Sequence, residues 1–212
     1  MAIITIEGLP GAGKTTLRDK LSEKGYNTIQ ELGGIVHIDK MPGDGKDLQG
    51  VLKIDDWFIE QESKRCCMCE SNEAVMDRNF FTHLTYSYGY SRLTGIPCFE
   101  KTIEKYDLAI SKGKLQLPDA LVYLDVLPQI SKQRQINVKK RLPEFWRNIG
   151  FLGDLRSAYF SLMNSLYGLD IHILNGEESI DENLNRLENI IKNSATYGNK
   201  RVDLTKFVAI LS

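Results

Sequence analysis

The chain has 212 residues, 42% of them hydrophobic, which is enough to bury a core. Lys and Arg together number 27 against 28 Asp and Glu, and the net charge of -1 gives no overall field that would hold DNA or an anionic membrane. No segment has the length of a membrane span, and the N-terminus lacks the pattern of a signal peptide. We therefore expect one cytoplasmic domain over residues 1–212, with a small molecule rather than nucleic acid or a membrane as its partner.

Short apolar runs alternate along the chain with longer segments of helical periodicity. We expect strands at residues 2–7, 27–31, 73–77, 120–126 and 170–174, and helices at 14–23, 80–93 and 179–193. This alternation is typical of an α/β fold in which helices cover both faces of a parallel sheet. We predict a three-layer αβα domain with five parallel strands. Ligands of such sheets bind beyond the carboxyl ends of the strands.

The first predicted strand leads into GLPGAGKTT at residues 8–16, which matches the phosphate-binding P-loop pattern G-x-x-x-x-G-K-[ST]. Its glycines permit backbone conformations that let successive N–H groups surround a phosphate at the start of the next helix. Lys14 is predicted to reach the β- and γ-phosphates of ATP, and the Thr15 hydroxyl to bind Mg²⁺. The predicted nucleotide-binding residues are Gly8, Pro10, Gly11, Ala12, Gly13, Lys14, Thr15 and Thr16.

The second and third predicted strands also end in chemistry-bearing side chains. Glu31 closes the second strand, and Asp77 and Arg78 close the third. An acid beside a P-loop can hold Mg²⁺ directly or through its waters, so Asp77 is a candidate metal ligand. A guanidinium fits phosphate oxygens better than an ammonium does, so Arg78 is a candidate for the acceptor or the moving phosphoryl group, although a salt bridge between neighbours is the alternative.

The segment between the second and third strands carries a charged pair and a group of cysteines. Glu62 and Arg65 lie three residues apart on an expected helix, and we favour their pairing with each other over contact with an acceptor. Cys66 and Cys69 form a C-x-x-C pair, but Cys98 alone does not provide a second ligand pair at zinc spacing. Reduced thiols are therefore the favoured interpretation of the cysteines.

The fourth predicted strand ends at Asp125, where a polar strand terminus and a role in the site are equally compatible with the sequence. A basic stretch follows, and we interpret residues 132–150 either as a solvated helix face or as a lid that closes over ATP. The lid interpretation is favoured for Arg134 and Arg141, because a bidentate cation stabilises the charge that develops in phosphoryl transfer. The basic residues of the stretch are Lys132, Arg134, Lys139, Lys140, Arg141 and Arg147.

The C-terminal third contains a turn, a helix and an unassigned tail. Asn175 begins an Asn-Gly turn that is expected to reverse the chain. The helix at 179–193 has an apolar face suited to packing on the sheet. Residues 195–212 are compatible with dimer contacts or with a loose tail. Residues 199–203 approximate the guanine-recognition pattern N-K-x-D but place Val202 where the acid belongs, which disfavours a GTPase switch.

Together, these segments resemble the thymidylate kinase-like branch of P-loop kinases, which includes thymidylate kinases and deoxynucleoside kinases. The resemblance rests on GLPGAGKTT, QELGG at 30–34, VMDRNFFTHLTYSYG at 75–89, DALVYLDVLP at 119–128, the basic stretch, and FLGDLRSAYFSL at 151–162. It implies phosphoryl transfer from ATP to a nucleoside monophosphate, with a deoxynucleoside kinase or another small-molecule kinase as the alternative. A homodimer is also compatible with it.

The resemblance also implies roles for individual residues. Glu31 would act near the acceptor as a base or as a carboxylate that organises the metal, and Arg78 would contact the acceptor. Asn175 would pass the adenine ring of the nucleotide, although a plain turn is the favoured alternative. Phe58 and Tyr86 would flank a planar base, with core packing as the alternative for both. Leu32 and Ser87 depart from the family pattern, which has proline and glutamine there. Because serine is too short to reach a base edge as glutamine would, the thymine specificity of the family does not transfer directly.

Overall fold

The computed structural model describes residues 2–36, 40–68, 74–136, 144–194 and 198–212. Seventeen elements run along this part of the chain. In order they are β1 (Ile3–Glu7), α1 (Lys14–Glu23), β2 (Thr28–Ile29), α2 (Leu32–Ile35), α3 (Leu48–Cys66), β3 (Ala74–Asp77), α4 (Phe81–Thr94), α5 (Phe99–Ser111), β4 (Ala120–Asp125), α6 (Pro128–Ile136), the 3₁₀ turn η2 (Glu144–Arg147), α7 (Ile149–Met163), β5 (Leu166–Tyr167), β6 (Asp170–Asn175), α8 (Ile180–Asn193), β7 (Arg201–Val202) and α9 (Leu204–Leu211).

The main sheet has five strands in the order β2-β3-β1-β4-β6, and every neighbouring pair is parallel. This arrangement confirms the predicted five-stranded parallel sheet. Its central strands are apolar because helices cover both faces, so they lack the alternation of a half-exposed strand. β1 lies between β3 and β4, which places the end of β1 at the middle of the sheet edge.

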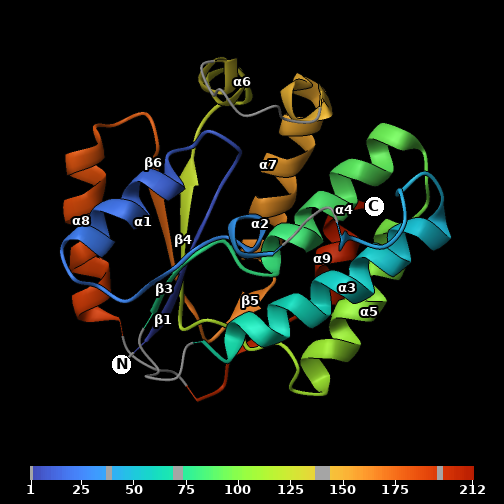
Figure 1. The fold of residues 1–212 in the computed structure, drawn as a ribbon, viewed down its shortest axis with the longest axis horizontal. Helices are drawn as coiled ribbons and strands as arrows, with labels where there is room; N and C mark the ends of the chain where they lie inside the picture. Colours follow the sequence, from blue (N-terminus) through green and yellow to red (C-terminus); the bar gives the residue numbers. More distant parts are fainter. Residues whose placement is uncertain (1, 37–39, 69–73, 137–143, 195–197) are drawn as a thin grey trace.

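Helices cover the two faces of the sheet unequally (Figure 1). α1 and α8 lie on one face, and α3, α4, α5, α7 and α9 lie on the other. α8 begins where the sequence predicted, because Ser179 and Glu182 form a capping box that satisfies the first backbone N–H groups. None of the described helices is long and apolar enough to cross a bilayer.

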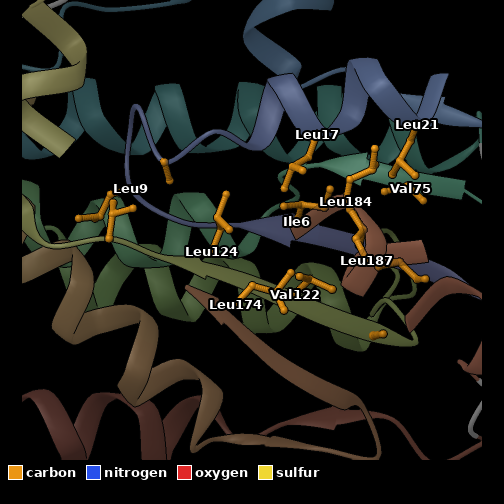
Figure 2. Packing of buried hydrophobic residues seen from close by; sticks show 14 of the residues in the cluster. Ile6, Leu9, Leu17, Leu21, Val75, Val122, Leu124, Leu174, Leu184 and Leu187 are labelled. Carbon is orange, nitrogen blue, oxygen red and sulfur yellow. The ribbon is translucent and has the colours of Figure 1, made fainter. Parts of the chain in front are cut away.

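The packing between α1, α8 and the sheet is drawn in Figure 2. Leu17 and Leu21 of α1 are fully buried, as is Leu187 of α8, and they lie against side chains from the central strands such as Ile6 and Val122. Each leucine buried in this way contributes about 1.5–3 kcal/mol relative to an exposed one. The apolar faces of the two helices therefore fix them on the sheet, and α1 carries the P-loop end into place.

The end of the chain is packed rather than loose. β7 pairs antiparallel with β5, and α9 buries Leu204 and Phe207 in the cluster that α4, α5 and α7 form. Of the two interpretations of this segment, the loose tail is wrong for residues 198–212. The apolar residues of α9 recur at helical spacing, so the helix has an apolar face that packs against the core. The dimer contacts considered for this segment stay a prediction.

Candidate active site

The P-loop follows β1 with the backbone that its glycines predicted. Gly8, Gly11 and Gly13 all have positive φ angles, of 146°, 74° and 109°. A Cβ atom at Gly8 would lie 2.5 Å from the carbonyl oxygen of Leu124, which no side chain tolerates. Gly13 forms the N-cap of α1, so the first N–H groups of that helix open toward the loop. The loop is therefore a backbone cradle of the kind that binds phosphate.

Lys14 is buried at the base of this cradle. Its Nζ donates hydrogen bonds to the carbonyl oxygens of Gly8 at 3.0 Å and Leu9 at 2.8 Å. Burial and, less strongly, the nearby Arg78 cation lower the pKa of Lys14 to about 7, although the acids of the site act in the opposite direction. A polyphosphate would supply the negative charge that this buried ammonium lacks.

Thr15 and Asp77 meet at the carboxyl ends of adjacent strands. β1 and β3 are paired so that Ile6 lies opposite Asp77, and the Thr15 hydroxyl donates a 2.7 Å hydrogen bond to Asp77 Oδ2. Asp77 is fully buried, and within the described residues its Oδ1 has no hydrogen-bond partner. A buried carboxylate oxygen without a partner is costly and marks a place where an ion or ligand belongs.

Glu31 and Arg78 form the next pair along this edge, with 3.3 Å between Glu31 Oε2 and Arg78 Nε. Arg78 is the one non-glycine residue with positive φ (63°) in the part of the chain described, a conformation that costs about 1–2 kcal/mol. Its Nη1 also donates to the hydroxyls of Thr82 at 3.1 Å and Tyr159 at 3.2 Å. Burial works to lower the pKa of Arg78, but Tyr86, Tyr159 and Glu31 raise it above its usual range, so the guanidinium stays charged.

Glu7 is a site residue that the sequence analysis missed. It is fully buried at the end of β1, where its carboxylate accepts hydrogen bonds from Asn79 N (2.8 Å), Thr82 Oγ1 (2.7 Å) and Tyr159 Oη (2.9 Å). Burial raises its pKa, while Arg78 and the three donors lower it. The sequence did contain a signal for it, since Glu7 stands between an apolar strand and the P-loop. A charged side chain buried at such a place needs partners, which makes it a candidate site residue.

The two aromatic residues predicted to flank a base lie in different surroundings. Phe58 on α3 packs against His83, with ring centroids 4.2 Å apart and ring planes tilted by 34°. Tyr86 on α4 makes edge contacts with Trp146 and Phe151, and the Arg78 guanidinium lies 5.8 Å from its ring centroid. No contact found among the described residues joins Phe58 to Tyr86. Their roles as base-flanking residues stay predictions.

α6 holds the outer side of the P-loop. Arg134 Nη1 donates to the carbonyl oxygens of Ala12 at 3.3 Å and Gly176 at 2.9 Å, and Ser131 Oγ donates to Pro10 O at 2.6 Å. Arg134 therefore connects the P-loop to the β6–α8 turn, which differs from the expected cation above the phosphates. Its part in charge stabilisation stays a prediction, and Arg141 lies outside the described residues.

Three further candidate residues, Asp125, Asn175 and Thr16, lie near the site. Arg156 forms two hydrogen bonds with Asp125, of 2.8 and 2.7 Å, which supports the interpretation of Asp125 as a polar strand terminus. The Asn175 side chain accepts from Glu177 N at 3.0 Å, as in a turn. Thr16 is exposed beside the P-loop.

The predicted pairing of Glu62 with Arg65 is confirmed, with 3.1 Å between Oε2 and Nε. Lys200 binds Asp119 and the Leu117 carbonyl before the start of β4, which is the sheet edge opposite the P-loop, so residues 199–203 do not approach the nucleotide cradle. Among the residues described, no group of three His, Cys, Asp or Glu side chains could hold a metal ion. A metal at Thr15 and Asp77 would therefore depend on phosphate and water for its other ligands.

Comparisons with known proteins agree with this geometry. A family model described as an AAA domain matches residues 3–149. A probable thymidylate kinase from Staphylothermus marinus is 28% identical, over 77% of this chain and 82% of its own length. The thymidylate kinase of Chlorobium luteolum is 29% identical, over 81% and 94%.

Solved structures share the fold at lower identity. A deoxyadenosine kinase from M. mycoides with bound dATP has a TM-score of 0.67 at 19% identity, and the alignment covers 90% of this chain and all of the other. The structure of the same kinase with the products dCMP and dCDP also has a TM-score of 0.67. The chain belongs to the AAA-domain family of P-loop proteins, and it is a thymidylate kinase-like P-loop kinase.

Proposed function

We propose that this protein transfers the γ-phosphoryl group of ATP to a nucleoside monophosphate. The observation that carries the proposal is the 2.7 Å hydrogen bond from Thr15 to Asp77 beside the 3.3 Å Glu31–Arg78 ion pair. Thr15 belongs to the P-loop, and Asp77 ends β3 beside it. Glu31 and Arg78 follow β2 and β3 at the same edge of the sheet, where an acceptor would meet the nucleotide. The thymidylate kinases to which the chain is similar support the choice of acceptor.

The residues present suit ATP and Mg²⁺. Gly8, Gly11 and Gly13 give the cradle its positive φ angles, a Cβ at Gly8 would collide with Leu124 O, and the buried Lys14 ammonium donates to the carbonyl oxygens of Gly8 and Leu9. Mg²⁺ prefers oxygen ligands, which the Thr15 hydroxyl and the unpartnered Asp77 Oδ1 can provide directly or through water. When bound, Mg²⁺ would neutralise charge on the polyphosphate.

The residues of the chain would then divide the work of positioning and charge stabilisation, which dominate phosphoryl transfer. Lys14 and the P-loop N–H groups hold the β- and γ-phosphates. Arg78 donates to the hydroxyls of Thr82 and Tyr159, which in turn donate to Glu7, and in this position its charge would be available to the acceptor. Glu31, whose side chain is 43% exposed, can meet an incoming molecule as a base or as a carboxylate that organises the metal.

A deoxynucleoside kinase is the alternative, and one observation favours it. Two carboxylates, Glu7 and Glu31, lie close to the Arg78 guanidinium at the acceptor end. Because the carboxylates offset the charge of the guanidinium, this end of the site would bind the phosphate of a nucleoside monophosphate less strongly than a cluster of cations would. A neighbouring carboxylate would, in contrast, activate the hydroxyl of an uncharged nucleoside. The solved structures of similar fold include deoxyadenosine kinase.

A panel of nucleosides and nucleoside monophosphates, each offered with Mg²⁺ and ATP and monitored by ADP release, tests the proposal. We expect turnover with at least one nucleoside monophosphate, and turnover with nucleosides alone would select the alternative. If every acceptor of both kinds is inert, the proposed substrate class is wrong. The cytoplasmic location and the homodimer stay predictions.

A further inference from the structure

A buried arginine on α3 connects the ends of the two strands that carry the acceptor-side residues. Arg65 is almost completely buried, with 1% of its side chain exposed, and so is its ion-pair partner Glu62 with 2% exposed. A buried ion pair gains little stability over apolar packing because both charges lose water. The acceptors of the other Arg65 donors therefore indicate what this residue does besides pairing with Glu62.

Those donors all point at backbone carbonyl oxygens of the site. Arg65 Nη1 lies 2.8 Å from Gln30 O and 3.4 Å from Asp77 O, and Nη2 donates to Arg78 O. Gln30 directly precedes Glu31, so one guanidinium contacts the backbone on both sides of the Glu31–Arg78 ion pair. A single planar group with donors in fixed directions thus sets how far apart the two segments lie.

The regular sheet leaves this distance undetermined. β2 and β3 pair only through Thr28 with Val75 and Ile29 with Met76, so the ladder ends before Glu31 and before Asp77. Arg78 also has the left-handed backbone described above, which persists only when its surroundings enforce it. Two contacts do so from opposite sides, the bond from Arg78 N to Ile6 O at 3.0 Å and the bond from Arg65 to Arg78 O.

We propose that Arg65 is a positioning residue of the kinase: it fastens the carboxyl end of β2 to that of β3 and thereby holds Glu31 and Arg78 in register. Arg65 acts through the backbone and touches no reacting atom. For its kinetic part this inference rests on the proposed phosphoryl transfer.

The test compares Arg65→Lys with Lys64→Met, which removes an exposed cation and its ion pair with Glu60 from the same helix. Lysine keeps the charge next to Glu62, but its three donors sit on one nitrogen, so they cannot span the separate acceptors that Arg65 reaches with Nε, Nη1 and Nη2. We expect Arg65→Lys to lower kcat about 10²-fold, as misplacement of about 1 Å does, and to raise KM for the acceptor while leaving KM for ATP unchanged. Lys64→Met should match the wild type in all three.

Amide hydrogen exchange provides a readout that needs no activity. Arg65→Lys should speed exchange in residues 27–34 and 76–82 together and leave residues 8–16 unchanged, because Arg65 contacts no P-loop residue in the described structure. Unchanged exchange in both segments, or a kcat equal to that of the wild type, would overturn the proposal. A wild type that phosphorylates no acceptor would instead overturn the proposed function, and exchange would still decide the role of Arg65.

If Arg65→Lys does not fold, variants of Glu62 decide. Glu62→Gln retains an oxygen that accepts from Arg65 Nε, so the guanidinium keeps its direction and kcat should stay within a few-fold of the wild type. Glu62→Ala removes that acceptor, and kcat should fall while exchange in residues 27–34 and 76–82 accelerates. Equal behaviour of the two variants contradicts a positioning role.

Discussion

Thr15 Oγ1 and Asp77 Oδ2 lie 2.7 Å apart although 62 residues separate them in the chain. The parallel pairing of β1 with β3 brings them together, since it places Asp77 opposite Ile6, at the entrance to the P-loop. The carboxylate reaches a hydroxyl of the nucleotide cradle without an intervening residue. The role of the negative charge of Asp77 can therefore be tested with a substitution that keeps the hydrogen bond from Thr15.

Asp77→Asn should lower kcat by about 10²-fold or more, because it removes a charge next to the reacting phosphates while an amide oxygen can still accept from Thr15. Turnover measured over a range of Mg²⁺ concentrations checks this, and we expect the variant to need more Mg²⁺. Asp125→Asn is the control, since that acid ends β4 on the other side of β1 but pairs with Arg156. Comparable losses of activity in both variants would contradict a role for Asp77 in the site.

Lys14→Met should abolish phosphoryl transfer without lowering the thermal unfolding midpoint. Methionine retains an unbranched apolar side chain of similar length but lacks the ammonium group that would bind the phosphates. Differential scanning calorimetry of the protein without nucleotide, together with the ADP-release assay, separates the two effects. Retained turnover would refute the role assigned to Lys14.

The lowered pKa of Lys14 also predicts a pH dependence. The folded protein without nucleotide releases the Lys14 proton near pH 7, whereas the unfolded chain keeps it up to about its usual pKa of 10.5. Between these values the unfolded state binds more protons, so this group makes the protein more stable as pH rises. The free energy of unfolding of the wild type, minus that of Lys14→Met, should therefore increase from pH 7 to pH 9 in urea titrations. A constant difference would show that the pKa is not lowered.

Two buried tyrosines allow a matched comparison of the Glu7 network. Tyr159→Phe deletes the hydroxyl that donates to Glu7 and should lower the free energy of unfolding by about 1–3 kcal/mol, because a buried carboxylate loses a hydrogen bond. Tyr123 stacks on Tyr159, and its buried hydroxyl has no hydrogen-bond partner within the described residues, so Tyr123→Phe should cost nothing. Urea unfolding at pH 7 measures both. Equal effects would mean that the Tyr159 bond to Glu7 contributes no stability.

Gly8→Ala should eliminate nucleotide binding, since the added Cβ would lie 2.5 Å from Leu124 O and force the cradle open. Gly25→Ala is the control: Gly25 also has positive φ, but its Cβ would meet nothing within 4 Å. It should cost backbone strain of about 1–2 kcal/mol without affecting binding. Titration with a fluorescent ATP analogue measures both variants, and normal binding by Gly8→Ala would contradict the described loop geometry.

Local signals in the sequence located the five strands of the main sheet and the helices α1, α4 and α8, whereas α5 and α7 were not predicted. The helix at 14–23 begins and ends where predicted, because Gly13 permits the turn and Leu17 and Leu21 share the face that packs on the sheet. The predicted strands differ from those of the structure by one or two residues at their ends, apart from the shorter β2. The short β5–β7 ribbon escaped prediction, since two-residue strands have no periodicity to detect.

The sequence by itself determined the P-loop, the parallel sheet and the acidic and basic strand ends, because each depends on residues close together in the chain and on a period that backbone geometry imposes. Only the tertiary structure decided that Glu7 anchors Tyr159, that Phe58 lies against His83 and that Arg65 binds the backbone of two strands. These contacts join residues whose separation carries no signal, since the packing of α3, α4 and α7 on the sheet brings them together. The choice of a buried partner depends on that packing, and local sequence patterns do not encode it.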